Sequence, residues 1–250
     1  MRTTIPLTLV AMLAAGMALA VDDATLVVRH EHYFVIVNAE DTAPTISVQS
    51  KAYYTYGDAL EIVATNPEGK RLLRTLVPLT GNQTLQIPGE VAEMYLVVAR
   101  PGMNGVIFDC DRPWGVAATD IWGLGSNNDV PPMYLYVPPE CEELTLNISA
   151  PSPREGGRIR VLRPDGGEAL VMDGEFDEPQ EQTIAVTEDA RGRVWSLLWD
   201  APQTVPGSLD DINVTVSGYL APLLWPKAEW AAEYGPEIWT RHKAAIDGEG

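Results

Sequence analysis

LEIVATNPEG, residues 60–69, contains a short strand and the turn that ends it. Every second side chain from Leu60 to Ala64 is apolar, which is the period of a strand with one buried face. Pro67 presets φ at the first corner of the turn, and Gly69, directly after the acid, tolerates a positive φ. The stretch therefore predicts a strand and tight turn of an antiparallel sheet.

The same pattern returns in the second half of the chain. IRVLRPDG, residues 159–166, repeats the alternation and the Pro-acid-Gly turn, and Pro67 and Pro164 lie 97 positions apart. Three further strands recur in the same order: 33–37 and 134–137, 84–88 and 183–186, 95–101 and 194–202. The repeat indicates a tandem duplication of one β-domain; the alternative is that two unrelated sandwiches share a strand order.

From this repeat we expect an all-β protein of two tandem antiparallel β-sandwich domains with a short C-terminal helical tail. The sandwiches cover 21–108 and 130–221, the connecting segment covers 109–129, and the tail covers 222–250. Within the tail, Lys227–Tyr234 and Pro236–Ile246 read as two short helices, because proline is tolerated in a first turn. Trp195 and Trp199 share one strand face and are expected in the core.

Residues 1–20 have the three regions of a secretory leader. A charged start at Arg2 precedes an apolar run, and Ala18-Leu19-Ala20 forms a small-x-small cleavage site. The apolar run is shorter than the ~20 residues of a membrane span, and no later stretch approaches that length. We expect a secreted, periplasmic or cell-surface protein with no transmembrane segment after cleavage.

The net charge of the chain without its leader argues against some classes of binding partner. Removal of the leader takes Arg2 with it, so 16 basic residues remain against 35 acidic ones, a net charge of −19. Such a surface repels nucleic acid and anionic membranes, which argues against both as partners. Solubility alone would also explain this charge.

The chain has two cysteines, Cys110 and Cys141. In an oxidising compartment two cysteines are more often bonded than free, so the expected export predicts a disulfide between them.

The second half resembles two kinds of secreted accessory β-sandwich. Residues 134–139, 144–149 and 159–166 are similar to the pre-peptidase C-terminal type of domain found beside bacterial exported enzymes, and 210–214 resembles the last strand of jelly-roll carbohydrate-binding modules. The resemblance implies a non-catalytic role. It also implies that an acid such as Asp210 or Asp211 helps to hold a structural calcium, the one cofactor expected.

His30 and His32 are the second candidate metal ligands. In a strand, alternate residues share a face, so these imidazoles would point the same way and could hold zinc or copper with a third ligand. The sequence names no third ligand, and a polar strand face is the alternative. For calcium, which takes six to eight oxygens, solvated loop acids are the alternative.

Aromatic side chains are the candidate ligand contacts, because sugar rings stack on exposed aromatic planes. Tyr53, Tyr54 and Tyr56 run into a turn, and Trp114 and Trp122 lie in the connecting segment. Packing in the core or at its rim is the alternative for all five.

No nucleophile, phosphate-loop or zinc-protease motif is present in the sequence. We therefore expect a secreted, non-catalytic binding module that binds carbohydrate or accompanies an exported enzyme. One alternative is a structural cell-surface or assembly protein that contacts a protein partner. The other is a small hydrolase that uses carboxylates or a metal.

Overall fold

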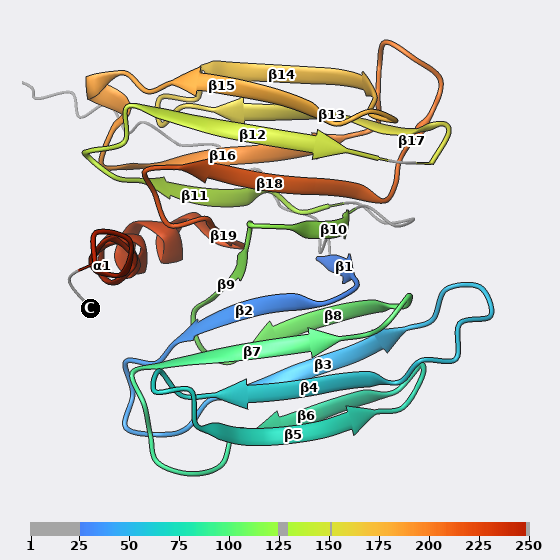
Figure 1. The fold of residues 1–250 in the computed structure, drawn as a ribbon, viewed down its shortest axis with the longest axis vertical. Coiled ribbons are helices and arrows are strands. Elements are labelled where there is room, and N and C mark those ends of the chain that lie inside the picture. Colours follow the sequence, from blue (N-terminus) through green and yellow to red (C-terminus); the bar gives the residue numbers. More distant parts are fainter. Residues whose placement is uncertain (1–25, 125–129, 151, 249–250) are drawn as a thin grey trace, which may run out of the picture.

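The computed structural model describes residues 26–124, 130–150 and 152–248, without the side chain of Trp122. The predicted leader lies outside these residues. Figure 1 shows strands stacked in layers, with the first half of the chain at the bottom, the second at the top and one helix at the side. An all-β, antiparallel architecture with a C-terminal helix is confirmed.

The first half contains nine strands: β1 (Val27–Arg29), β2 (His32–Val37), β3 (Thr45–Lys51), β4 (Leu60–Thr65), β5 (Arg71–Val77), β6 (Asn82–Gln86), β7 (Met94–Arg100), β8 (Gly105–Cys110) and β9 (Trp114–Ala117). The second half contains β10 (Ile121–Leu124), β11 (Met133–Val137), β12 (Glu143–Ser149), β13 (Glu155–Leu162), β14 (Glu168–Glu175), β15 (Gln180–Ala185), the 3₁₀ turn Glu188–Ala190, β16 (Arg193–Asp200), β17 (Ser208–Leu209), β18 (Ile212–Gly218), β19 (Leu223–Trp225) and α1 (Ala228–Ile246).

Each half has the strand order of a jelly roll. In the first half, β1-β8-β3-β6 form one layer and β9-β2-β7-β4-β5 form the other. In the second half, β10-β18-β12-β15 and β19-β11-β16-β13-β14 repeat this order strand for strand, with β17 as an addition beside β13. The topology thus carries the repeat that the sequence predicted, and every recurring sequence stretch falls on equivalent strands.

The halves share both layers instead of standing apart. β1 pairs with β10, β9 pairs with β19, and both pairings are antiparallel. Val28 pairs with Val106 as Ile121 pairs with Val214, so the next residues, Arg29 and Trp122, are equivalent positions that face each other. Equivalent strands that pair with each other define a pseudo-twofold axis, here inside one chain.

A continuous apolar core runs through both halves. Period-2 alternation points Phe34 inward from β2, where it stacks on Phe108 of the opposite layer with ring centroids 4.1 Å apart. Trp114 meets the same two rings edge-on, at 5.7 and 5.1 Å. In the second half, the buried Trp195 donates its indole N–H to the carbonyl of Ala190 at 2.9 Å. Trp199 is also buried, so both tryptophans lie in the core as predicted.

The predicted connecting segment contains two of the strands that join the halves. β9 and β10 both lie within residues 109–129, where a composition rich in Gly and Asp indicated a loop. Gly115 has a packing role there, because a Cβ at this position would come within 2.8 Å of Leu223 on β19. The strand pairing at the centre of the molecule therefore depends on a glycine that suggested a turn.

The tail forms one helix where the sequence predicted two. α1 runs through Pro236, which removes one backbone N–H from the helix interior. Packing against β11, β16 and β19 holds the helix together, and Ala231 of the helix joins the buried Trp225 of β19 in a small apolar cluster. The helix also contacts the first half, since Arg241 pairs with Glu93 at 2.8 Å.

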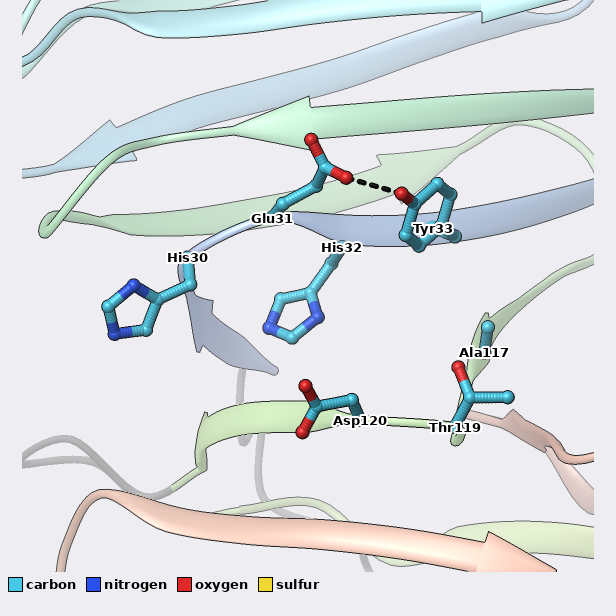
Figure 2. A pocket seen from close by; sticks show the side chains of 7 residues that line it. All are labelled: His30, Glu31, His32, Tyr33, Ala117, Thr119 and Asp120. Carbon is cyan, nitrogen blue, oxygen red and sulfur yellow. Dashed lines mark hydrogen bonds between the residues drawn. The ribbon is translucent and has the colours of Figure 1, made fainter.

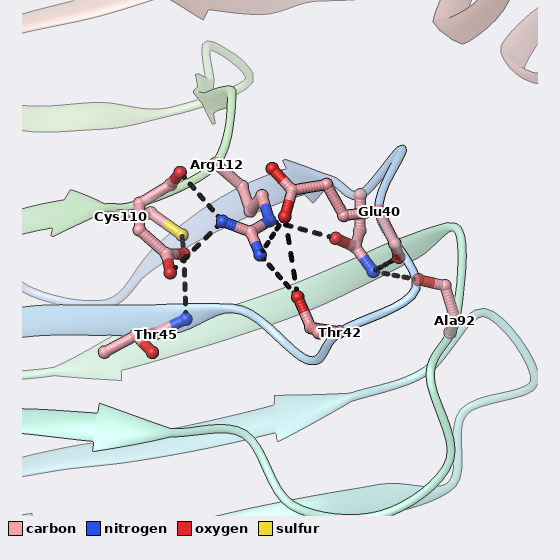
Figure 3. A network of polar contacts seen from close by, with 8 residues as sticks. Glu40, Thr42, Thr45, Ala92, Cys110 and Arg112 are labelled. Carbon is pink, nitrogen blue, oxygen red and sulfur yellow. Dashed lines mark hydrogen bonds and ion pairs between the residues drawn. The ribbon is translucent and has the colours of Figure 1, made fainter.

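The predicted disulfide is wrong: Cys110 and Cys141 are both free and buried. Cys110 ends β8 in the first half, beside the Asp111 and Arg112 network of Figure 3. Arg112 donates to Asn38 at 3.2 Å and to Thr42 at 2.8 Å and so holds the loop after β2. Cys141 follows β11 in the second half and donates to the carbonyl of Glu143 at 3.1 Å.

Cys110 therefore lies at the end of a strand in the first half and Cys141 in the loop before β12 in the second half, each with its own contacts. Burial raises the pKa of the Cys110 thiol to about 12, which keeps it protonated.

Candidate functional site

Two turns close to the pseudo-twofold axis form a pocket between the halves. The turn between β1 and β2 supplies one wall and the turn between β9 and β10 supplies the other. Figure 2 shows its lining, which consists of His30, Glu31, His32, Tyr33, Ala117, Thr119 and Asp120. The cavity volume is about 430 Å³, within the size range of small-ligand sites.

His30 and His32 both line this pocket, but the expectation that they share the face of one strand is not met, because His30 lies in the turn before β2 (Figure 2). His30 has a left-handed backbone, with φ of 64°, which places its ring at the mouth of the pocket. Burial and the neighbouring Arg29 guanidinium lower the pKa of His30, while Asp211 and Asp120 oppose them more weakly. His32 is 1% exposed and lies deeper.

Glu31 points away from the histidines and fixes the turn from outside. It accepts hydrogen bonds from the Tyr33 hydroxyl and from Arg100, and these bonds lower the pKa of its carboxyl. Arg100 also pairs with Glu61 at 3.2 Å, and Glu61 pairs with Arg74 at 2.6 Å. This row of alternating charges crosses β7, β4 and β5 and holds the pocket wall on the rigid sheet.

A second, smaller cavity lies on the other side of His30. Its volume is about 160 Å³, and it is lined by Arg29, His30, Met103, Gly123, Ser152, Asp211 and Asn213. Arg29 is 8% exposed, donates to the Met103 carbonyl at 3.2 and 3.0 Å and pairs with Asp211 across the two halves. Asn213 is also buried, accepts from the Gly123 amide and donates to Ser149, both at 3.3 Å.

The predicted metal ligands do not gather into a ready-made cation site. Asp211 pairs with Arg29, and Asp210 lies next to it in the chain. Among the described residues, no three His, Cys, Asp or Glu side chains are grouped so that they could hold a metal ion. A structural calcium and a His-bound metal stay predictions.

The five candidate aromatics separate into buried and exposed groups. Tyr53 is 8% exposed and lies beneath the cations of Arg29 and Lys51, whose distances to its ring centroid are 5.1 and 5.3 Å. Trp114 belongs to the core. Tyr54 is 88% exposed and meets Tyr56 edge-on at 6.1 Å.

Of the four whose side chains the structure describes, Tyr54 is exposed, Tyr56 is half-buried, and Tyr53 and Trp114 are buried. The side chain of Trp122 lies outside the described part of the chain.

Sequence reasoning named His30 and His32 but missed their partners in the pocket. Thr119 and Asp120 come from the turn between β9 and β10, inside the segment taken as a connection. The internal repeat held a usable signal, because fused copies related by a twofold axis bring equivalent edge strands together. That rule would have placed the turn after β9 near the turn after β1.

Comparison with known proteins identifies no family. No family model matches the chain, so the resemblance to the pre-peptidase type gains no support, and no curated protein matches it. A similar solved structure is an F-lectin (fucolectin) from the serum of the striped bass, Morone saxatilis, which is 11% identical. The match covers 79% of this chain and 83% of that chain with a TM-score of 0.21, too low to support an argument.

In the described ranges, no helix combines the length and the apolar character that crossing a membrane requires.

Proposed function

We propose that the protein is an exported, non-catalytic carbohydrate-binding module and that the pocket between His30 and Asp120 is its ligand site. The observation that carries this proposal is the pocket itself. It offers imidazole, hydroxyl and carboxylate groups together with one aromatic ring, Tyr33, in a cavity the size of a small ligand. Sugars present hydroxyl groups that both donate and accept, and C–H faces that pack on aromatic rings.

The electrostatics of the pocket suit a neutral, hydroxylated ligand. The lowered pKa of His30 favours its neutral imidazole, which carries both a donor and an acceptor nitrogen. Asp120 adds an acceptor, and Thr119 adds a hydroxyl. The charge of Glu31 is neutralised outside the pocket by Arg100.

Export and a supporting aromatic surface complete the proposal. The leader-like sequence of residues 1–20 supports passage to the periplasm, the cell surface or the medium. The exposed Tyr54 and the half-buried Tyr56 beside it supply an aromatic pair that would contact a longer glycan beyond the pocket.

The test is a glycan-array screen of residues 21–250, run in calcium and in EDTA. We expect binding that Asp120→Ala and Thr119→Val each weaken about ten-fold, the effect of one lost hydrogen bond. Asp177→Asn, an exposed acid in the turn between β14 and β15, is the matched control and should leave binding unchanged. Loss of binding in EDTA would add a calcium site.

Absence of binding to every glycan in both buffers would overturn the proposal. It would favour the alternative of an assembly protein, whose contact surface would be the outer face of β2, β7 and β5. The side chains of Tyr33, Leu96 and Leu76 are exposed there by 39%, 38% and 62%.

A further inference from the structure

The two cavities at the junction meet at one side chain. His30 lines both the cavity of about 430 Å³ and the cavity of about 160 Å³. The larger lies against the turn between β9 and β10, and the smaller lies against Met103, Ser152 and the start of β18. Figure 2 shows the His30 ring at the edge of the larger cavity, turned away from Tyr33. A ligand that passes over His30 therefore reaches both.

The smaller cavity is polar but balanced in charge. Arg29 and Asp211 form an ion pair in its wall, and both oxygen and nitrogen of the Asn213 amide are already engaged. Ser152 adds a hydroxyl to the lining. Because the ion pair cancels the net charge of the wall, the cavity favours a neutral group with hydroxyls over a free anion or cation.

The walls of this cavity are held in place before a ligand arrives. The guanidinium of Arg29 is fixed by two hydrogen bonds to the Met103 carbonyl and by a cation–π contact with the Tyr53 ring. His30 and Asp211 both have left-handed backbones, with φ of 64° and 46°. Left-handed backbone at non-glycine residues costs free energy and persists where the surroundings fix it, often at binding sites.

The sizes of the cavities set the length of the ligand. At about 30 Å³ per water, the smaller cavity has room for about five waters, which is enough for part of one sugar unit. The larger cavity has well over twice that volume.

We propose that the ligand is an oligosaccharide of at least two units, with one unit in the larger cavity and the neighbouring unit crossing His30 into the smaller one. This inference rests on the proposed function, because it assigns a ligand length to the same site. It adds Arg29, Ser152 and Met103, which the first cavity alone does not include.

The experiment measures calorimetric affinities of residues 21–250 for mono-, di- and tetrasaccharides of glucose, galactose and mannose. For the sugar that binds, we expect the disaccharide to bind at least about ten-fold more tightly than the monosaccharide, as one or two added hydrogen bonds would give. Equal affinity for the two would overturn the two-cavity inference and leave the proposed function standing. No binding to any saccharide would overturn both.

Two matched variants test the contributions of the two cavities separately. Ser152→Leu fills the smaller cavity and should remove the preference for the disaccharide while leaving the affinity for the monosaccharide intact. Thr119→Leu fills the larger cavity and should weaken both. A preference that survives in folded Ser152→Leu contradicts the inference; if this variant melts before binding can be measured, the wild-type ratio of the two affinities decides.

Discussion

Gly235 marks the closest approach of the helix to the sheet. A Cβ at this position would lie 2.4 Å from the Cβ of Tyr136 and 2.7 Å from the first carbon of its ring. Contacts this short force the helix or the strand to move. Glycine is unfavourable inside a helix, but at this position it allows α1 to rest on β11.

Gly235→Ala should destabilise the protein. Alanine improves helix propensity by about 1 kcal/mol, but overpacking against Tyr136 costs about 1–3 kcal/mol, so we expect the steric effect to win. Urea unfolding followed by tryptophan fluorescence measures the difference. Gly57→Ala is the control, because a Cβ there meets nothing within 4 Å, and its stability should be unchanged or slightly higher. A Gly235→Ala variant as stable as Gly57→Ala would show that the helix shifts at no cost.

Glu155, whose carboxyl is hydrogen-bonded by Ser152, gives a pH-dependent prediction. Burial, together with the charges of Asp211 and Asp210, raises its pKa above the ordinary 4.5, and one carboxylate oxygen is buried without a hydrogen-bond partner among the described residues. A raised pKa means that the folded state disfavours the charged form. The cost is absent below pH 4.5 and develops as the pH rises through the folded-state pKa.

Glu155→Gln should therefore stabilise the protein at pH 7 and have little effect at pH 4. We expect an increase in the thermal midpoint of about 1–2 °C at neutral pH, since partial solvent exposure limits the effect. Calorimetry at the two pH values tests it, with Glu178→Gln, an exposed acid in the turn before β15, as the control. A variant that is less stable at pH 7 would mean that the carboxylate has a partner that it needs.

At the scale of the element, α1 acts as a clamp across the two halves. Trp239 is 4% exposed, lies edge-on to Tyr219 at 4.8 Å and donates to Glu140 at 3.3 Å. Lys243 pairs with the same Glu140 at 3.0 Å, and Arg241 reaches Glu93 in the first half. Since Pro236 weakens the helix from within, these contacts determine whether α1 is ordered.

Trp239→Ala should detach the C-terminal half of the helix. Removing a buried tryptophan costs about 3–5 kcal/mol, and it also removes the hydrogen bond to Glu140. We expect a lower unfolding midpoint and faster amide exchange from Trp239 to Ile246. Thr240→Ala, which changes an exposed neighbour, should leave exchange unaffected. If amide exchange from Trp239 to Ile246 were no faster in Trp239→Ala than in Thr240→Ala, Trp239 would not be what holds the helix in place.

At the scale of the whole molecule, the sequence predicted the parts better than their assembly. The alternation at Leu60, Ile62 and Ala64 and the turn at Pro67 are local signals, and the strand they predict is β4. The sequence did not predict that β9 and β10 join the halves, because four-residue strands that contain Gly115 and Gly123 resemble loops. The pocket could not be predicted from local sequence either. His30 and Asp120 lie 90 positions apart and meet only through the twofold arrangement.

The pseudo-twofold arrangement makes a prediction about the isolated first half. A fragment of residues 21–119 contains all nine strands of one jelly roll but leaves the pairing edges of β1 and β9 open. In the intact chain these edges pair with their own equivalents, as Val116 does with Leu224. Two copies of the fragment can therefore meet edge to edge, β1 with β1 and β9 with β9, in an isologous contact. Light scattering after gel filtration should show a dimer, and adding residues 120–250 should convert it to a one-to-one complex. A fragment that stays a folded monomer at micromolar concentration would show that each half is an independent domain and that the shared sheets contribute little to its stability.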